Sequence, residues 1–497
     1  MTGPRSRLPN RRGLAMPWAS RTSTLYSSPR SFVFKLALGE APEHIPTVRD
    51  ARVGAARLPS RTGVLAVDRV IAHYADGCRV ARVHDAAGAA APGTRHNGYD
   101  DVEQAVGLAR TFRVDTERGA PIAHIVAALR SLTPVEEASP QYLSMAPFEA
   151  AAAEAEPDAW QPRDLVNAAE AMAYEAGDPA VIVAFLDTGV METHGELANH
   201  LRAGLDTVQL TPGDVAAGAR LLGDESGVDD DPADEVGHGT SCTAIVGAIG
   251  QSIPPGLGGA CGLLPIRVLG AAELPGRPHP VGVGAISDID CGMKRAVDLG
   301  ARVLNMSFGT PLAGLDPSDP VPHADVVRYA LARGCVLVAA SGNSGQEEAY
   351  APAALAGVIA VSAVGADGLP CAFATSGPHV ALAAPGERVL TATLDGYGRV
   401  TGTSFAAPFV TAAAALCVSR GARRAYPVDA QTAKRVLTES AQAWPAGKGA
   451  GHGAGVLDAH AALRLLDQEM DRAPPPQAEV VRGSLNNGRP GSDGKDG

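Results

Sequence analysis

The side chains of Asp187, His238 and Ser404 are reactive and stand next to apolar or glycine-rich segments, where folded α/β proteins hold functional groups. Asp187 directly follows the apolar run Val181–Leu186, which places its carboxylate at the carboxyl end of a buried strand. His238 lies between two glycines, so other groups can approach its imidazole closely. Taken alone, the two residues are also explained as a turn aspartate and as a surface or capping histidine.

Ser404 precedes the nearly all-apolar stretch Phe409–Val418, which indicates a buried helix that begins near this serine. The free amide groups and positive potential of a helix N-terminus favour a serine oxygen and a developing oxyanion. Asn343 follows the apolar run Val336–Ala340, and a side-chain amide at a strand end is a suitable oxyanion donor. The simpler explanations are a serine helix cap and a turn asparagine.

In combination, these residues and their surroundings resemble one family, the subtilisin-like (subtilase) serine peptidases, whose triad residues come in the order Asp, His, Ser. The resemblance covers roughly residues 178–466. It is carried by a series of motifs in the family's order: Asp187–His194, Gly237–Thr240, Leu304–Gly309, Ala339–Asn343, Val358–Val364, Ala383–Gly386, Gly402–Pro408 and Gly453–Ala459.

The resemblance implies a serine endopeptidase that hydrolyses peptide bonds through an acyl-enzyme and needs no cofactor for its chemistry. Ser404 would attack the scissile carbonyl, His238 would take its proton, Asp187 would hold the imidazole, and Asn343 would help to hold the oxyanion. Substrate-binding residues are implied in three segments: Gly282, Val283 and Gly284; Ser307, Phe308 and Gly309; and Ala340, Ser341 and Gly342. The first two segments would sandwich an extended peptide, and the third would line S1, the pocket for the side chain that precedes the scissile bond.

The sequence departs from the family pattern at a few positions. Phe405 and Phe409 replace the usual Met and His of the serine motif. The resemblance also places Tyr350 near the base of S1, where it would narrow the pocket. Glu196 and Gln251 stand where some relatives bind calcium through Asp and Asn. The longer side chains leave a structural Ca²⁺ open and its ligands unknown.

Two further features surround His238. Cys242 follows it by about one helical turn, so its sulfur is expected close to the imidazole. An acidic run from Asp224 to Glu235 leads into His238. It predicts either a preference for basic residues near the scissile bond, a solvated acidic turn or a calcium loop.

Three other functions were weighed. A binding module that kept the fold without activity would lack part of the triad, and all of it is present here. An esterase of the α/β-hydrolase class would carry a G-x-S-x-G motif and another triad order. The acid-acting, Glu-based relatives of subtilases lack the histidine that stands here at position 238.

The elements that must position these residues alternate between short apolar strands and helical patterns. Continuous apolar runs such as Val336–Ala340 and Val358–Val364 are typical of parallel strands buried on both faces. The predicted fold is therefore α/β, a subtilisin-like, mostly parallel sheet with helices on both faces, preceded by a small α+β domain. The expected domains are a basic tail (1–30), a propeptide-like domain (31–145), a linker (146–160), the catalytic domain (161–466) and a C-terminal tail (467–497).

The propeptide-like domain is predicted from a strand–helix–strand pattern. Thr111–Val114 is strand-like, apolar residues from Ile122 to Leu132 form one helix face after Pro121, and an extended segment follows to Tyr142. Family resemblance implies that this domain is an intramolecular inhibitor which lays its last strand, near Glu136–Tyr142, into the substrate groove. The protein would then be an autoprocessed zymogen. An unrelated accessory domain is the alternative.

Composition limits partners and location. A net charge of −12, with all 54 acidic residues outside the Arg-rich residues 1–30, argues against nucleic acid as a partner. We find no apolar run long enough for a membrane span. Seven scattered cysteines and no recognisable signal peptide favour a reducing, cytoplasmic location, with non-classical export as the alternative. We expect a monomer that acts on proteins or peptides.

Overall fold

The computed structural model describes residues 27–472, apart from 41, 43–44, 89–97, 118, 147–149, 153–157, 198–200, 216–217 and 276. The predicted tails therefore lie largely outside the described residues, but their inner ends are corrected. The first strand begins at Ser27, and the last helix runs to Arg472, past the predicted domain end at residue 466. Pairing with a partner strand and burial of Met470 extend these elements.

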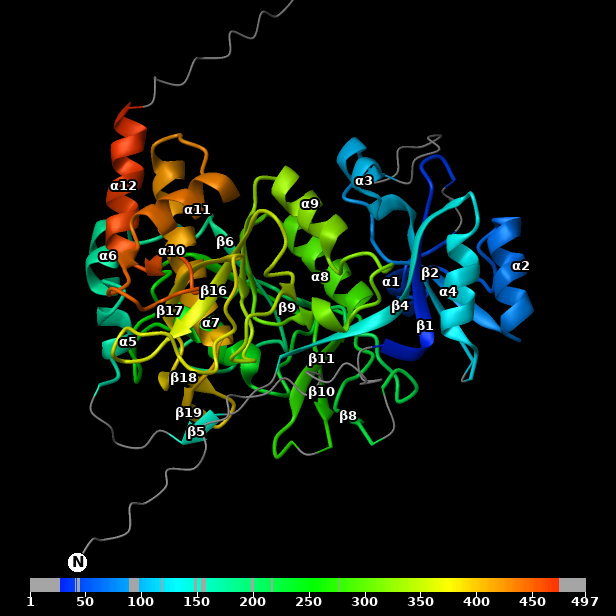
Figure 1. Ribbon diagram of the computed structural model, residues 1–497, viewed down its shortest axis with the longest axis horizontal. Coiled ribbons are helices and arrows are strands. Elements are labelled where there is room, and N and C mark those ends of the chain that lie inside the picture. Colours follow the sequence, from blue (N-terminus) through cyan, green and yellow to red (C-terminus); the bar gives the residue numbers. More distant parts are fainter. Residues whose placement is uncertain are drawn as a thin grey trace, which may run out of the picture.

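A mostly parallel sheet forms the centre of the larger domain, and the predicted fold class is confirmed (Figure 1). Its strands lie in the order β20 (Gln442–Ala443), β21 (Gly455–Val456), β17 (Val380–Pro385), β16 (Val358–Val364), β14 (Val336–Ala340), β12 (Ala301–Met306), β6 (Ile182–Asp187), β9 (Gly262–Arg267) and β7 (Leu205–Asp206). Only β20 runs antiparallel to its neighbour among the described pairs.

Both faces of this sheet are buried because helices cover each of them. Val183 and Phe185 of β6 pack into the core on one face, while Ala184 and Leu186 pack into the core on the other. The first core includes residues of α6 (Ala168–Tyr174), α7 (His238–Gly247), α10 (Thr403–Arg423), α11 (Ala430–Glu439) and α12 (Ala459–Arg472). The second includes residues of α8 (Ile286–Asp298) and α9 (Ala324–Ala332). This two-sided burial explains the continuous apolar runs.

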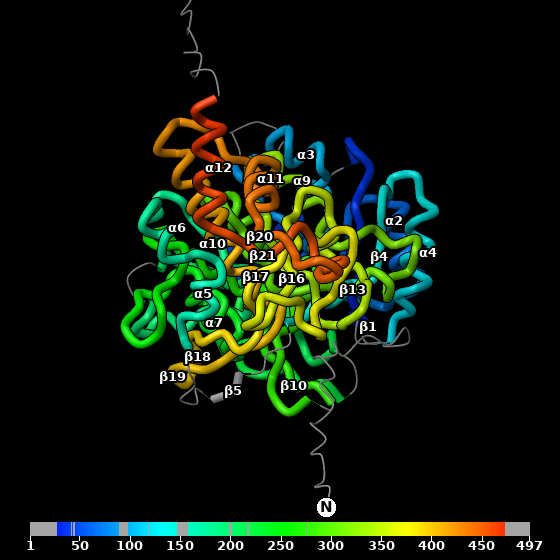
Figure 2. The backbone as a smooth tube through the Cα atoms, turned by 60° about the vertical axis from the view of Figure 1, so that its left-hand side comes forward, coloured from blue at the N-terminus to red at the C-terminus, as the bar shows by residue number. Residues whose placement is uncertain are grey.

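The smaller N-terminal domain has its own core. Its elements are β1 (Ser27–Leu36), α1 (Val48–Arg52), α2 (Leu65–Tyr74), β2 (Cys78–Arg82), α3 (Asp101–Val106), β3 (Thr111–Thr116), α4 (Ile122–Arg130) and β4 (Val135–Ala146). The α4 helix begins after Pro121, as predicted, and buries Ile122, Ile125, Val126 and Leu129 against the strands. Figure 2 shows α2 and α4 at the edge of the molecule away from α6 and α12.

A second sheet crosses from one domain into the other. Its strand order is β2-β3-β1-β4-β11-β10-β8, with β11 (Val281–Ala285), β10 (Gly270–Glu273) and β8 (Arg220–Leu222) from the larger domain. The crossing is made by β4, which pairs with β1 up to Tyr142 and then pairs antiparallel with β11 through residues 143–146. The prediction that Glu136–Tyr142 enters the groove is therefore wrong. That segment pairs with β1 inside the N-terminal domain, and the next residues, 143–146, pair with β11 instead.

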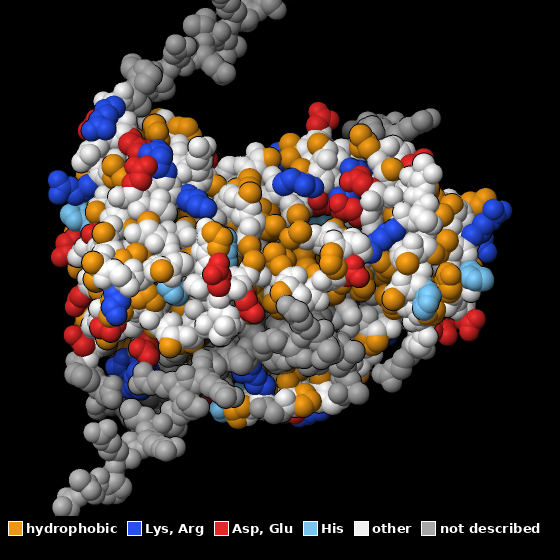
Figure 3. Space-filling view, viewed as in Figure 1, with side chains coloured by type: hydrophobic (Ala, Val, Ile, Leu, Met, Phe, Trp, Pro, Cys, Tyr) orange, Lys and Arg blue, Asp and Glu red, His pale blue; other side chains and the backbone are white. Residues whose placement is uncertain are grey.

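Charged side chains join the two domains. Glu103 and Lys294 form a wholly buried ion pair with a distance of 2.6 Å between Oε1 and Nζ. Arg113 lies 2.9 Å from Asp288 Oδ1, and Lys35 lies 3.0 Å from Asp325 Oδ2. Acidic and basic side chains gather near this boundary around α3 and α9 (Figure 3). Ion pairs thus join the two domains in addition to the β4–β11 pairing and the apolar contacts of Val102, Val106 and Leu108.

The segment predicted as a linker from 146 to 160 is not uniform. Ala146 ends β4, and β5 (Ala150–Ala152) pairs with β19 (Gly396–Val400), which also pairs with β18 (Val389–Thr393). The rest of the segment up to residue 157 lies outside the described residues. The chain enters the larger domain at α5 (Gln161–Asp164). A short pair, β13 (Thr310–Pro311) and β15 (Tyr350–Ala351), completes the strands described.

Candidate active site

Asp187 is the last residue of β6, at the carboxyl end of the central sheet. Its side chain is buried, and its Oδ1 accepts a 2.7 Å hydrogen bond from the backbone N–H of Thr188. The same oxygen lies 2.6 Å from Nδ1 of His238. Because a carboxylate can only accept, Nδ1 carries the proton, and Nε2 is the nitrogen with the lone pair.

His238 is the first residue of α7, and its glycine neighbours allow the helix to start against β6. Gly237 has a positive φ of 96°. A Cβ atom at Gly239 would lie 2.1 Å from the carbonyl oxygen of Gly189, so only glycine fits there. The helix start therefore comes close enough to the strand end for the imidazole to meet Asp187.

Asp234 fixes the start of α7 through five hydrogen bonds. Its carboxylate accepts from the backbone N–H groups of residues 236, 237 and 240, and from the hydroxyls of Thr188 and Thr240, at 2.7–3.0 Å. Sequence reasoning placed Asp234 in an acidic run that was expected to face substrate, to be a solvated turn or to bind calcium, and it missed this contact. A signal was available, since an Asp a few residues before a helix start commonly accepts its free amide protons.

Other members of the acidic run also have partners within the protein. Glu235 lies 2.8 Å from Arg267, and Asp230 lies 2.9 Å from Arg49 of the N-terminal domain. Part of the acidic run is therefore held in ion pairs within the protein. Asp229 and Asp231 remain exposed.

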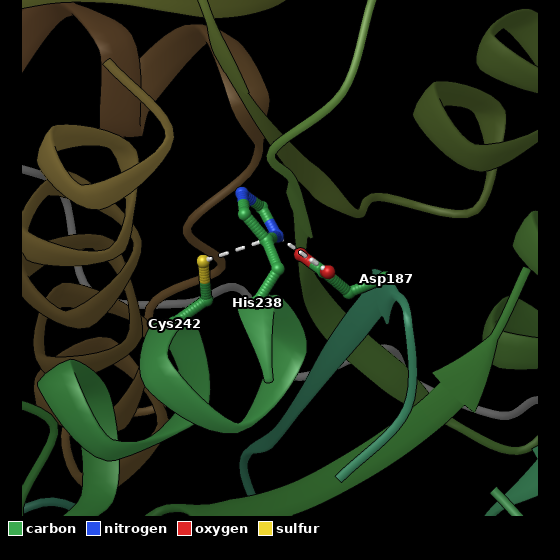
Figure 4. Close-up of side chains that lie close together, drawn as sticks. All are labelled: Asp187, His238 and Cys242. Carbon is green, nitrogen blue, oxygen red and sulfur yellow. Dashed lines mark hydrogen bonds and ion pairs between the residues drawn. The ribbon is translucent and has the colours of Figure 1, made fainter. Parts of the chain in front are cut away.

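Ser404 is the second residue of α10, and the residue is 4% exposed. Its hydroxyl donates a 3.1 Å hydrogen bond to the carbonyl oxygen of Ser307. The thiol of Cys242 lies 3.4 Å from the Ser404 carbonyl oxygen and 3.9 Å from Nδ1 of His238, and so connects the serine backbone with the imidazole. Figure 4 shows the imidazole between Asp187 and Cys242 at the start of α7.

Phe405 and α10 close the back of the site. The Phe405 ring lies 5.3 Å from the His238 ring, centroid to centroid, where the family pattern has methionine. Within the described residues, α10 is the one helix long and apolar enough to cross a membrane, and 89% of the relevant window is buried inside the protein. It is the core helix that holds Ser404.

Asn343 follows β14 and is oriented by Thr403. Its Oδ1 accepts 2.9 Å hydrogen bonds from the backbone N–H and the hydroxyl of Thr403. Because the carbonyl end of the amide is fixed by two donors, Nδ2 is left as the donor end, and Asn343 lines the pocket beside Ser404. The predicted oxyanion donor is thus next to the predicted nucleophile.

The two predicted substrate strands lie on either side of one segment of the chain itself. In β11, Gly282 pairs with Ala146, Val283 with Met145 and Gly284 with Ser144. On the opposite side, the N–H of Gly309 donates a 3.3 Å hydrogen bond to the carbonyl oxygen of Met145. The groove between the two strands therefore holds residues 143–146 of β4 as an extended strand.

A small pocket opens beside Ser404 and matches the predicted S1 in part. Ser307, Phe308, Gly309, Ala340, Gly342 and Asn343 line it, together with Tyr350, Thr403, Ser404 and Met145. Ser341, which was predicted with them, does not line it. Its hydroxyl donates a 3.0 Å hydrogen bond to the carbonyl oxygen of Thr375.

The residues considered for metal binding do not fit a cation. Glu196 accepts hydrogen bonds from the backbone N–H groups of residues 250–253 at 2.6–3.4 Å. Amide protons pointing into a site suit an anion, whereas Ca²⁺ needs oxygen ligands. Asp187, His238 and Cys242 have ligand atoms within 4.8 Å of one another, but their 2.6 Å hydrogen bond leaves no room for an ion between Asp187 and His238.

Comparison with known proteins gives a family match. The profile of the Subtilase family matches residues 178–462, more than half of the chain. A thermostable alkaline protease of Halalkalibacterium halodurans is 31% identical over 242 residues, which make up 48% of this chain and 62% of that protein. The major intracellular serine protease of Bacillus subtilis is 31% identical over 262 residues, with shares of 51% and 73%.

The chain thus spans less than two thirds of the first of these relatives and more than two thirds of the second. Among solved structures, a protease from Pseudoalteromonas arctica is similar with a TM-score of 0.50 and 24% identity. The similarity covers 61% of this chain and 94% of that one, and it shows a shared fold.

Proposed function

The chain belongs to the subtilase family, and from this premise we propose that it is a serine endopeptidase with Ser404 as nucleophile, His238 as base and Asp187 as its partner. The observation that carries the proposal is the 2.6 Å contact between Asp187 and His238 beside a serine at the start of a buried helix. A hydroxyl, an imidazole and a buried carboxylate in this arrangement suit acyl transfer.

In the proposed reaction, the Ser404 oxygen attacks the scissile carbonyl carbon while Nε2 of His238 takes the hydroxyl proton. The new oxyanion accepts hydrogen bonds from Nδ2 of Asn343 and from the backbone N–H of Ser404. His238 then protonates the leaving amine, and an acyl-enzyme remains on Ser404. Water, deprotonated by His238, hydrolyses this ester, so no cofactor takes part.

The experiment that tests this proposal compares the wild type with Ser404→Ala in casein hydrolysis. Loss of nearly all activity in the variant is expected, because residues that act as a unit fail together. Labelling of the wild type, but not of the variant, by a fluorophosphonate would identify the nucleophile directly. Equal hydrolysis by both proteins would overturn the assignment.

We also propose that the N-terminal domain inhibits the enzyme intramolecularly until the chain cuts itself. Support comes from residues 143–146, which occupy the groove as an added strand, and from β5, which pairs with the strand that leads to Ser404. Cleavage is expected between Ala146 and Ala150. N-terminal sequencing of the mature protein checks this, and Ser404→Ala should stay uncut. An active enzyme that remains one uncut chain would contradict the proposal.

A further inference from the structure

Tyr350 is one of the residues that line the pocket beside Ser404, and its ring limits the space in that pocket. The residue before a scissile bond has its Cβ next to the carbonyl carbon that Ser404 would attack, so its side chain must enter the nearest space. That space is the pocket lined by Gly309, Gly342 and Asn343. Tyr350 lines the same pocket and is 1% exposed.

The Tyr350 ring lies between two walls of this pocket. A Cβ atom added to Gly309 would lie 3.3 Å from Cδ1 of the ring. On the other side, a Cβ atom added to Gly342 would lie 2.9 Å from both Cδ2 and Cε2. The ring thus fills the width between the two glycines, and each wall is close enough that even a methyl group would crowd it.

Several contacts hold the ring in place. The Tyr350 hydroxyl donates a 2.9 Å hydrogen bond to Glu348 Oε2. The Tyr350 backbone pairs with Pro311 across the short sheet of β13 and β15. Its side chain also belongs to the apolar core that contains Val283 and Met145. Moving the ring aside for a large substrate side chain would break packing and a hydrogen bond together.

We infer that Tyr350 determines the specificity of this site and restricts the residue before the scissile bond to Gly, Ala or Ser. This inference rests on the proposed endopeptidase function and deepens it. Overpacking a rigid pocket is costly, so a Leu or Phe side chain at this position should be discriminated against by at least about tenfold. Cuts would then follow single small residues in extended protein segments.

The test uses the purified full-length chain and peptides that differ only in Ala, Leu or Phe at one position. Mass spectrometry locates the cut, and kcat/KM is measured for the wild type, Tyr350→Ala and Tyr350→Phe. The wild type should favour the Ala peptide over the Phe peptide at least about tenfold. Tyr350→Ala should bring the two within about threefold, whereas Tyr350→Phe, which keeps the ring, should behave like the wild type.

If Tyr350→Ala fails to fold, Tyr350→Leu replaces it as a smaller change in volume, and it should likewise bring the Ala and Phe peptides closer together. Cleavage after Phe as fast as after Ala by the wild type would overturn the inference while leaving the endopeptidase in place. Hydrolysis of no peptide and no fluorophosphonate labelling, even after the chain has been cut between Ala146 and Ala150, would overturn the proposed function and, with it, this inference.

Discussion

At the scale of single residues, the imidazole of His238 is in contact with two side chains of opposite character. Asp187 accepts a hydrogen bond from Nδ1, the nitrogen that carries the proton. The Cys242 thiol lies 3.9 Å from the same nitrogen. Burial, and then the negative charge of Asp187, raises the pKa of Cys242 well above its ordinary value. The thiol therefore stays neutral near pH 7 and would not compete for the proposed base.

A reagent that adds bulk to Cys242 should displace the imidazole and inhibit the enzyme. We expect a small neutral mercurial to inhibit the wild type slowly, since the sulfur is buried. Cys242→Ala should resist it. Cys291→Ala, which removes a more exposed thiol, is the control and should be inhibited like the wild type. Inhibition of Cys242→Ala at the wild-type rate would show that another cysteine is responsible.

The carboxylate of Glu196 holds the loop of residues 250–253 through backbone hydrogen bonds, at a position where some relatives bind calcium. Burial alone would raise the pKa of Glu196, but the backbone hydrogen bonds outweigh this effect and lower it. A lowered pKa means that the stabilisation is present above the ordinary carboxyl range and is lost as the pH falls through the folded pKa. Glu196→Gln should therefore lower the free energy of unfolding by about 2 kcal/mol at pH 7.

Urea unfolding at pH 7 and at pH 3 measures this difference, which should shrink at the lower pH. Glu192→Gln removes an exposed carboxylate nearby and should change little. A chelator should leave the stability of the wild type unchanged at both pH values. A large chelator effect that Glu196→Gln abolishes would show that the loop binds a cation after all.

Sequence reasoning singled out Asp187, His238, Asn343 and Ser404, and the structure gathers them around one site. It did so because each follows a strand or begins a helix within a recognisable motif. The bonds of Asp234 to the helix start could have been recognised from its position, but its bond to Thr188, far away in the sequence, could not. Bonds of that kind depend on how the helix and strand are folded together.

At the scale of elements, the placement of α7 would determine whether the His238 imidazole can act as the proposed base. Asp234→Asn would turn a donor N–H₂ group toward N–H and O–H donors at the helix start, and α7 should shift. We expect a stability loss of about 2 kcal/mol and a drop in kcat of roughly tenfold or more, with KM little changed. Asp231→Asn, in the same acidic run but exposed, is the control and should match the wild type. A normal kcat in Asp234→Asn would show that Asp234 does not position His238.

Element boundaries show where sequence patterns stop being informative. β14 and β16 have the predicted bounds, since burial on both faces makes each an unbroken apolar run. β4 extends beyond its predicted end at Tyr142 through Ala146. Its last residues are ordered by β11, whose sequence lies far downstream, so the local pattern around residue 143 carries no sign of the pairing.

At the scale of the whole molecule, the contact between the two domains should depend on pH. Burial raises the pKa of Asp288 to about 7, although Arg113 of the N-terminal domain opposes this shift. Asp115 and Asp214 lie in the same buried cluster and add negative charge to it. A raised pKa means that the stabilisation is complete below the ordinary aspartate range and is lost as the pH rises to about 7.

Measurements on the Ser404→Ala chain, which should stay uncut, would show this effect. Between pH 4 and pH 7 its free energy of unfolding should fall relative to that of the same chain with Asp288→Asn. The difference should reach at most about 1.4 kcal/mol per pH unit, the limit for one proton. Parallel pH profiles of the two chains would mean that Asp288 stays ionised in the interface.

The sheet that runs from β2 to β8 through β4 has a consequence for the enzyme once β4 leaves. Removal of residues 143–146 turns β11 from an interior strand into an edge strand, with a row of backbone N–H and C=O groups that lack partners. Any extended chain can satisfy them, including a strand of another copy. The proposed maturation would therefore uncover an aggregation-prone edge, and we expect the cut protein to self-associate at concentrations where the covered Ser404→Ala chain stays dispersed.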